Sequence, residues 1–377
     1  MITQNYSYAE EFIDTLHLEF AHFEEMIPNG TKVFEIHLGG GSPSWLKPSE
    51  LKRLLYPILN SPKLIIDKNI LEQSIEMDPR TTTPEHCESL ADLGFNRVSL
   101  GIQDTNPVVL KSIRRDQPLE LVTKVINGLK ENGIKLLNLD LIYGLPFQTP
   151  ESIKKTIEDI LVFQPTRLAL YSYAHVPSRS PSQKLLERDG LPSPEEKMRI
   201  HDVARELLTA AGYFEIGMDH FALPSDSLYK SYIKKELHRN FMGYTVQRSK
   251  VLLGLGPSSL SDAWTAFSQN EKDYKTWREL ILKNGNAIIH GHILSERELY
   301  IRRKILDLMC EFETNLTEDD LGSEQKEKIK DLITDEILTK KEDFYQATPL
   351  GRHFIRNICM AIDDSYLKSD QVFSKTL

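Results

Sequence analysis

Several polar residues and one run of glycines stand where short apolar segments of the chain end, and their types suit a polar small molecule. Glu76 and Asp140 lie inside apolar segments, where a carboxylate is costly to bury unless something donates hydrogen bonds to it. The glycine run 39–41 would let a ligand approach the backbone closely. Arg115 could fork onto a carboxylate. A ligand that joins an amino acid to a ribose would use all of these groups.

Each of these residues, taken alone, also has a structural explanation. A glycine triplet after a strand is more often a turn. Glu76 and Asp140 also suit buried ion pairs or helix caps, and Arg115 beside Arg114 suits a solvated surface. Their joint placement at successive strand ends favours a shared site. The spacing by itself predicts either a barrel enzyme or a binder of a polar small molecule.

The segments that must position these residues alternate between strand and helix patterns. Strands are predicted at 33–38, 74–77, 97–102, 134–143 and 167–173. Amphipathic stretches with helical spacing separate them. This alternation predicts an α/β fold with a partial parallel (β/α) barrel, in which functional residues lie just past the C-terminal ends of the strands.

The remaining sequence predicts further parts of the chain. We expect the partial barrel in 1–220, a region that completes the barrel and carries a substrate loop in 221–294, and a mainly helical domain in 295–377. Residues 222–262 are rich in Gly, Ser, Asn and Tyr and look loop-like. Residues 336–349 predict two short strands of a winged-helix-like unit.

Composition limits the class of protein. The chain has 377 residues, is 40% hydrophobic and 27% charged, and carries a formal net charge of −9. This balance is typical of a globular soluble protein, and it argues against a dedicated nucleic-acid surface. No apolar run has the length of a membrane span and the N-terminus has no leader pattern, so we expect a cytoplasmic protein.

Eight strings of the sequence carry a more specific signal than any spacing. They occur in order at 39–43, 74–80, 94–104, 138–150, 173–175, 217–222, 237–244 and 355–360. In these strings the chain resembles the oxygen-independent coproporphyrinogen III oxidases, a family of the radical S-adenosylmethionine (SAM) superfamily. The strings at 217–222 and 237–244 favour the oxidase over its relative, the haem chaperone.

The resemblance implies a fold, an activity and cofactors. Members of the family bind two SAM molecules beside a [4Fe-4S] cluster. They oxidatively decarboxylate two propionates of coproporphyrinogen III to give protoporphyrinogen IX in haem biosynthesis, with a 5′-deoxyadenosyl radical taking a hydrogen from the substrate. The electron donor is not implied. In this division of labour the cofactors carry the hard chemistry, and the protein positions the substrate and shields the radical.

The resemblance also implies site residues, each by its position in a matching string. The positions that match SAM contacts are Gly40, Gly41, Ser42, Glu76, Gln103, Arg115, Asp140, Ala174 and, in the segment 290–293, His292. The basic loop after residue 237 adds candidates for the substrate carboxylates, namely His238, Arg239 and Arg248, although a solvated basic loop explains them equally well.

The cysteines depart from the family pattern. The family's CxxxCxxC loop, which holds the cluster, precedes the segment that aligns with residues 10–20, and we expect the first barrel strand and this loop to be missing. Cys87, Cys310 and Cys359 lie far apart in the sequence, so they form neither a local metal motif nor a disulfide framework. We therefore expect the family fold and ligand pocket, with this chain alone inactive.

Two other functions stay open. One is a clusterless protein that binds SAM or a tetrapyrrole without turnover. The other is a haem-chaperone-like member, against which the strings at 217–222 and 237–244 argue.

Overall fold

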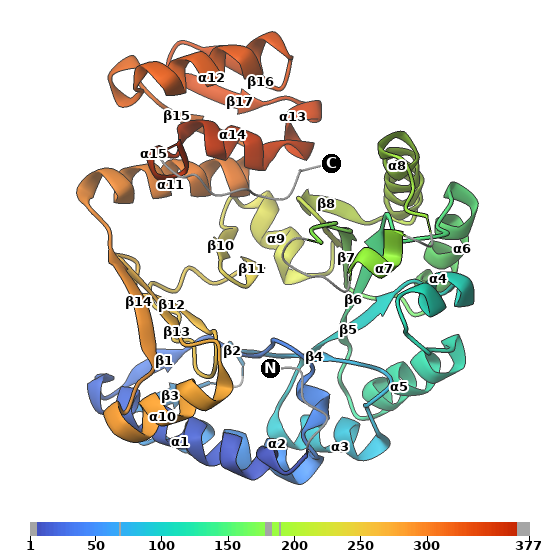
Figure 1. Cartoon of the computed structure of the whole chain (residues 1–377), viewed down its shortest axis with the longest axis vertical. Coiled ribbons are helices and arrows are strands. Elements are labelled where there is room, and N and C mark those ends of the chain that lie inside the picture. The colour runs from blue at the N-terminus through green and yellow to red at the C-terminus, as the bar shows by residue number, and fades with distance from the viewer. Residues whose placement is uncertain (1–5, 68, 178–182, 188–189, 368–377) are drawn as a thin grey trace. The chain divides into compact units, whose positions relative to one another are not determined.

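The computed structural model describes residues 6–67, 69–177, 183–187 and 190–367, which fall into two compact units (Figure 1). The first unit comprises Met1–Ile102, Gln117–Leu139 and Ser249–Leu294, and the second comprises Gln103–Asp116, Asp140–Arg248 and Ser295–Leu377. Both units combine distant parts of the chain. The predicted domain boundaries at residues 220 and 294 stay a prediction. In the described part of the chain, no helix has the length and apolarity needed to cross a membrane.

The alternation of strands and helices builds a mostly parallel sheet, with the strand order β2-β4-β5-β6-β7-β9-β8. Its strands are β2 (Glu35–Leu38), β4 (Glu72–Met77), β5 (Arg97–Gln103), β6 (Leu136–Tyr143), β7 (Arg167–Ser172), β8 (Phe214–Gly217) and β9 (His220–Ala222). The first unit holds β2, β4 and nearly all of β5, and β6 runs from the first unit into the second. The predicted α/β fold is therefore confirmed.

Alternating side chains decide which face of the sheet each strand residue occupies. In β4, Gln73, Ile75 and Met77 are buried, whereas Ser74 and Glu76 point to the opposite, less buried face. The same alternation recurs in β5 and β6. Polar residues of parallel strands are thereby collected on one face, while the apolar residues of the other face pack beneath helices.

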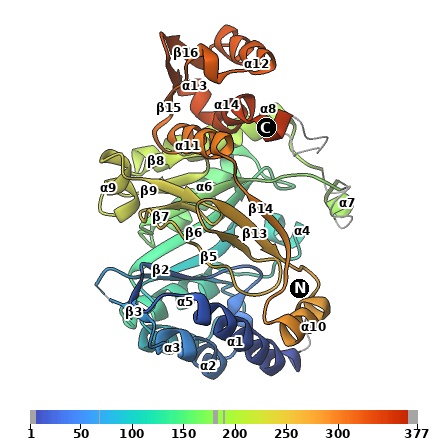
Figure 2. The same ribbon diagram turned by 90° about the vertical axis from the view of Figure 1, so that its left-hand side faces the viewer.

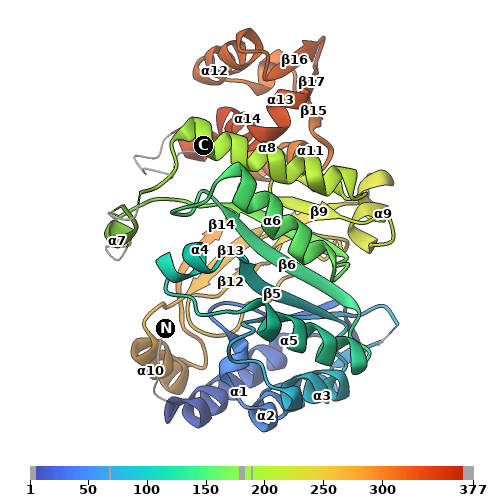
Figure 3. The same ribbon diagram turned by 90° about the vertical axis from the view of Figure 1, so that its right-hand side faces the viewer.

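Four helices of the first unit pack one against the next, as Figure 3 shows. They are α1 (Tyr8–Met26), α2 (Pro48–Leu59), α3 (Pro84–Leu93) and α5 (Leu119–Glu131). Proline opens α2 and α3, where its missing N–H costs no hydrogen bond. At the end of α3, Gly94 takes the left-handed conformation, with φ of 89°, that lets the chain turn into β5.

The first unit also contains smaller sheets. An antiparallel sheet joins β12 (Leu260–Asp262), β13 (Ala266–Asn270) and β14 (Ile288–Ile293), with α10 (Tyr274–Asn284) between the last two strands (Figure 2). A parallel pair joins β1 (Thr31–Val33) and β3 (Leu64–Ile66).

In the second unit, two groups of elements accompany β7, β8 and β9. The first group is α4 (Pro107–Ser112), α6 (Pro150–Leu161), α7 (Lys184–Glu187), α8 (Pro194–Ala210), α9 (Ser227–Ile233) and the hairpin of β10 (His238–Asn240) and β11 (Gly243–Thr245). The C-terminal group is α11 (Glu296–Glu311), β15 (Glu313–Asn315), α12 (Ser323–Thr334), β16 (Leu338–Lys341), β17 (Phe344–Ala347), α13 (Pro349–His353), α14 (Ile355–Ile362) and α15 (Asp364–Leu367). The two strands expected within 336–349 are confirmed as β16 and β17.

Two predictions of local structure were wrong. The single strand at 33–38 is broken at Phe34, because β1 pairs with β3 whereas β2 pairs with β4. Residues 222–262 are not one loop, since they contain α9 and the β10–β11 hairpin. The strands β10 and β11 are so short that their pairing with each other, rather than the propensity of their residues, determines where they form.

A buried carboxylate links the start of the first unit to its last segment. Glu19 is fully buried on α1. Its carboxylate accepts hydrogen bonds from the Gly256 backbone N–H at 2.7 Å and from Asn270 Nδ2 at 2.6 Å. Burial raises the pKa of Glu19, and both of these hydrogen bonds oppose that shift. One side chain thus joins segments that are 237–251 residues apart in the sequence.

Replacing Glu19 with Ala should destabilise the chain. The substitution removes the acceptor of the buried Gly256 N–H, whereas Asn270 Nδ2 keeps the Gly256 carbonyl and Ser259 Oγ as acceptors. A buried donor left unsatisfied costs about 1–3 kcal/mol, so we expect the free energy of unfolding, measured by urea denaturation, to fall by about 1–3 kcal/mol. Glu25→Ala, which removes an exposed carboxylate from the same helix, is the control. Equal losses in the two variants would contradict this role of Glu19.

Candidate functional site

Two glycines after β2 present bare backbone beside a carboxylate. Gly40 and Gly41 have φ of 77° and 71°, a conformation that strains other residues. A Cβ built on either glycine would meet nothing within 4 Å. The Gly40 N–H donates to Glu76 Oε2 at 3.2 Å. The structure therefore brings together the glycine run and Glu76, with room for a ligand against the backbone.

His37 lies beside Glu76 and lowers the pKa of its carboxyl. Its Nε2 lies 3.5 Å from Glu76 Oε1, and its Nδ1 is hydrogen-bonded to Ser74 Oγ at 2.9 Å. The contact with His37 holds the pKa of Glu76 below its usual value against the opposing effect of burial, and the Gly40 N–H lowers it further. Because the side chain is still 46% exposed, a charged carboxylate is available to a cationic ligand.

Gly39 is needed for this packing. A Cβ at Gly39 would lie 2.5 Å from His37 Nε2 and 3.1 Å from Glu76 Oε1, so any side chain here would displace the imidazole. A side chain at position 39 is therefore excluded by steric overlap. At Gly40 and Gly41 a side chain is disfavoured by the left-handed backbone conformation.

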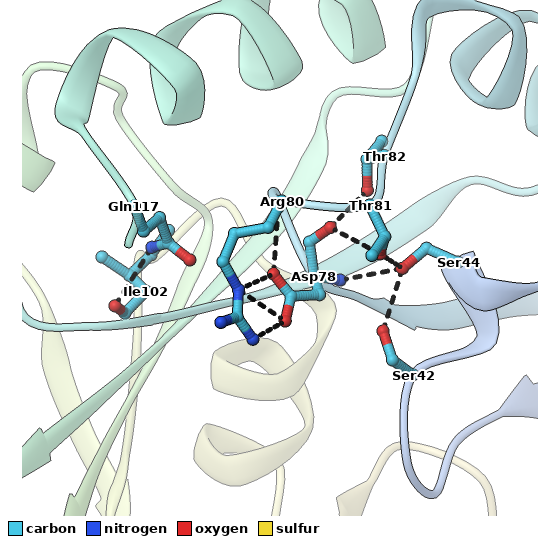
Figure 4. A network of polar contacts seen from close by, with 8 residues as sticks. All are labelled: Ser42, Ser44, Asp78, Arg80, Thr81, Thr82, Ile102 and Gln117. Carbon is cyan, nitrogen blue, oxygen red and sulfur yellow. Dashed lines mark hydrogen bonds and ion pairs between the residues drawn. The ribbon is translucent and has the colours of Figure 1, made fainter. Parts of the chain in front are cut away.

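Ser42 lies at one end of a polar network shown in Figure 4. Its hydroxyl is hydrogen-bonded to Ser44 Oγ at 2.9 Å, and Ser44 Oγ is in turn hydrogen-bonded to Thr81 Oγ1 at 2.6 Å. Ser44 Oγ also accepts from the Asp78 N–H at 3.2 Å. The loop after β2 is thereby tied to the loop after β4, on which Arg80 forks onto the Asp78 carboxylate at 2.6–3.2 Å.

At the end of β5, Gln103 has a left-handed backbone with φ of 68°, unusual for a residue other than glycine. The next residue, Asp104, is buried and accepts from the Asn106 N–H at 2.7 Å, Gln148 Nε2 at 2.6 Å and Thr156 Oγ1 at 2.7 Å. Burial raises the pKa of Asp104 although these hydrogen bonds lower it. The network braces the turn that carries Gln103.

Sequence reasoning gave Asp104 and its partners no role. A signal was present, since an aspartate directly after a predicted strand is costly to bury without donors. The donors Gln148 and Thr156, however, are 44 and 52 residues away and cannot be paired with Asp104 by spacing.

The other predicted SAM positions lie at strand ends or loops. Asp140 is half-buried on the less buried face of β6, and Arg115 is half-buried after α4. Ala174 is exposed after β7, and its carbonyl accepts from Gln183 Nε2 at 3.2 Å. His292 lies on β14, whose residues are all exposed. The ligand assignments of these residues stay predictions.

The three basic candidates differ in their surroundings. Arg248 donates to the carbonyls of Lys235 at 2.7 Å and Glu236 at 3.2 Å, which occupies much of its guanidinium. The Arg239 guanidinium stacks over the ring of Tyr244, with 4.8 Å between its central carbon and the ring centroid. His238 is half-buried on β10.

The cysteines present do not fit an iron–sulfur cluster. Cys87, Cys310 and Cys359 are buried, and burial raises their thiol pKa values to about 11, 12 and 12. Cluster ligands are thiolates, whereas these surroundings favour the neutral thiol. Within the described ranges, no three His, Cys, Asp or Glu residues are grouped in a way that could hold a metal ion.

Removing the imidazole of His37 should change the titration of Glu76. Because the folded-state pKa is lowered, the charged carboxylate contributes stability above its unfolded pKa and loses it as the pH falls through the folded pKa. In His37→Ala we expect the pKa of Glu76 to rise, so the stabilisation becomes smaller and its loss is complete at a higher pH. Carboxyl carbon NMR of glutamate-labelled protein measures the shift. Glu151, whose pKa is lowered by contacts at its own helix N-terminus, should not move, and an unchanged Glu76 would contradict the assignment.

Comparison with known proteins identifies the family of the chain. The sequence profile of the radical SAM superfamily matches residues 10–160. The oxygen-independent coproporphyrinogen III oxidase of Escherichia coli K12 is 34% identical over 389 residues, covering 100% of this chain and 84% of the relative. That of Pseudomonas aeruginosa is 35% identical over 357 residues, covering 92% and 77%. The solved structure of coproporphyrinogen III oxidase from E. coli, described as a radical SAM enzyme, superposes with a TM-score of 0.91 at 34% identity, covering 97% of this chain and 85% of that one. The chain therefore belongs to the oxygen-independent coproporphyrinogen III oxidase family of radical SAM enzymes.

Proposed function

We propose that this protein, when a segment with cysteine ligands for the cluster is joined to it, oxidatively decarboxylates coproporphyrinogen III to protoporphyrinogen IX. The observation that carries the proposal is the likeness, over nearly the whole chain, to relatives named for this substrate. Incubation of the assembled enzyme with coproporphyrinogen III, SAM and a reductant, followed by quantification of protoporphyrinogen, tests it. Absence of product from a cluster-loaded preparation would contradict it.

The residues of the first unit fit the methionine part of SAM. The charged carboxylate of Glu76 can accept hydrogen bonds from an ammonium group, and Gly40 and Gly41 leave backbone and space beside it. Ser42 offers a hydroxyl on the same loop. When bound, SAM would supply the radical chemistry of the family. The chain's own residues orient the ligand and hold the carboxylate in its charged form.

The remaining assignments to SAM rest on the resemblance alone. They are Gln103, Arg115, Asp140, Ala174 and His292. We also assign His238, Arg239 and Arg248 to the substrate carboxylates, for which guanidinium and imidazole groups are suitable donors. The number of SAM molecules bound is part of the same proposal.

Glu76 should control SAM affinity. In Glu76→Gln the side chain keeps its shape but loses its charge, and hydrogen bonds to charged groups contribute about 1.5–3 kcal/mol. We expect the dissociation constant for SAM, measured by equilibrium dialysis without reductant, to rise about tenfold or more. The control is Glu88→Gln, which removes an exposed carboxylate from α3. Unchanged affinity in Glu76→Gln would remove Glu76 from the site.

These 377 residues by themselves should not hold the cluster, and so should not turn over substrate. The three cysteines lie far apart in the sequence, and their thiols are all buried. Anaerobic reconstitution with iron and sulfide should leave the chain almost free of iron and without a thiolate-to-iron absorption band. About four irons per chain, the content of one [4Fe-4S] cluster, would show that this proposal is wrong.

A second function, binding of a tetrapyrrole or SAM without turnover, is favoured by the same buried cysteines. Titration with coproporphyrin III separates the two. A saturable shift of the porphyrin absorption band, together with no product from a preparation that carries the cluster, would favour the binding protein.

A further inference from the structure

Three of the strings that resemble the family are not used by the SAM assignments, and the structure brings residues of two of them, 217–222 and 237–244, into one cluster of the second unit. Asp219 lies between β8 and β9, Arg239 on β10, Tyr244 on β11 and Arg356 on α14. Tyr244 Oη donates to the Met309 carbonyl at 2.7 Å, which anchors the β10–β11 hairpin on α11. Burial raises the pKa of the Asp219 carboxyl, and the positive charges of Arg356 and Arg239 oppose that shift.

Gly217 leaves space for this anchor. A Cβ at Gly217 would lie 2.4 Å from Tyr244 Oη, so a side chain there would push the tyrosine away from its place. We call Asp219, His220, Arg239 and Tyr244 the Asp219 cluster. The close fit of Tyr244 against Gly217 shows that this part of the cluster is tightly packed.

The polar groups of the Asp219 cluster are left without partners. His220 Nδ1 and Arg239 Nη1 are completely covered, yet neither has a hydrogen-bond partner in the described part of the chain. Among the same residues, the Asp219 carboxylate makes no hydrogen bond or ion pair, and burial raises its pKa more than the charges of Arg356 and Arg239 lower it. Two covered polar atoms without partners lower stability, and together with the neighbouring half-buried carboxylate they point to a ligand that would supply the partners.

Aromatic and apolar surface adjoins these polar groups. His220 stacks edge-to-face on Tyr244, with 5.7 Å between ring centroids, and on Tyr171, with 6.1 Å. Tyr171 is 39% exposed. At the turn of the hairpin, Phe241 and Met242 are 47% and 46% exposed. The ligand that suits such surroundings is flat or bowl-shaped, largely apolar, and charged at its edge.

We propose that the Asp219 cluster binds the macrocycle of the tetrapyrrole substrate, with Asp219 accepting hydrogen bonds from pyrrole N–H groups and Arg239 forking onto a peripheral carboxylate. A porphyrinogen directs four N–H donors toward its centre and offers no acceptor there, so a lone carboxylate complements it. The inference rests on the proposed function, which supplies a carboxylated porphyrinogen as the ligand.

His220 and the arginines have distinct parts in this arrangement. Burial, followed by the charges of Arg239 and Arg167, lowers the pKa of His220 to about 3, so the imidazole is neutral and does not compete with Arg239 for an anion. Arg239 keeps its position by stacking on Tyr244, and its guanidinium makes no hydrogen bond among the described residues that binding would have to break.

The test compares three ligands and three variants of the chain without reductant. Coproporphyrinogen III, kept reduced under argon and quantified after equilibrium dialysis, has all four pyrrole N–H groups, whereas coproporphyrin III has two. In Asp219→Asn we expect binding of coproporphyrinogen III to weaken about tenfold and binding of coproporphyrin III to weaken less. In Arg239→Gln we expect coproporphyrin III to bind about tenfold more weakly, and its tetramethyl ester to bind as it does to the unmodified chain. Arg199→Gln, an exposed arginine on α8, is the control.

Thermal unfolding separates a binding role from a structural one. Since Asp219 lacks partners, Asp219→Asn should keep or raise the melting temperature while it weakens binding. If the unmodified chain binds neither coproporphyrinogen III nor coproporphyrin III, the proposed function and this inference are both wrong. If it binds them and the Asp219 and Arg239 variants bind equally well, only the inference is wrong. A lower melting temperature with unchanged affinity would likewise assign Asp219 a structural role.

Discussion

The organisation of this chain depends on the alternation of side chains along parallel strands that are covered by helices. In β4 and β6 every second residue is buried beneath a helix layer, and all of these residues except Gln73 are apolar. The residues between them are only partly buried and can be polar, as Ser74, Glu76, Asn138 and Asp140 are. The same constraint that builds the core thus leaves a row of polar side chains, and it explains why carboxylates inside strands are tolerated.

Much of the fold follows from the sequence for this reason, and so does part of the candidate site. The period of two and the proline and glycine signals predict the parallel strands and the helices between them. The contact of Gly40 with Glu76 links two predicted strand ends. Contacts between distant residues could not be predicted in this way. Glu19 and Asn270 are 251 residues apart, and Asp104 meets Thr156 across 52 residues. No periodicity connects such pairs, since only the packed chain brings them together.

Four carboxylates of the chain differ in how many hydrogen-bond donors surround them. This difference separates the carboxylates that hold the fold together from those that could bind a ligand. Glu19 and Asp104 are buried with several donors each, which suits carboxylates that hold segments together. Glu76 is partly exposed and kept charged by His37, and Asp219 is half-buried without a partner among the described residues. Glu19 and Asp104 therefore support the fold, whereas Glu76 and Asp219 have capacity left for a ligand. At the three cysteines burial outweighs every effect that favours a thiolate, including the neighbouring arginine charges at Cys310 and Cys359.

A structure of the chain crystallised with SAM is the decisive test of whether Glu76 and the loop after β2 bind the amino-acid end of this ligand. We expect the methionyl ammonium within hydrogen-bond distance of the Glu76 carboxylate, with the ligand lying against the Gly40 and Gly41 backbone. SAM bound elsewhere in the chain, with Glu76 still in contact only with His37 and Gly40, would show that this site does not bind SAM.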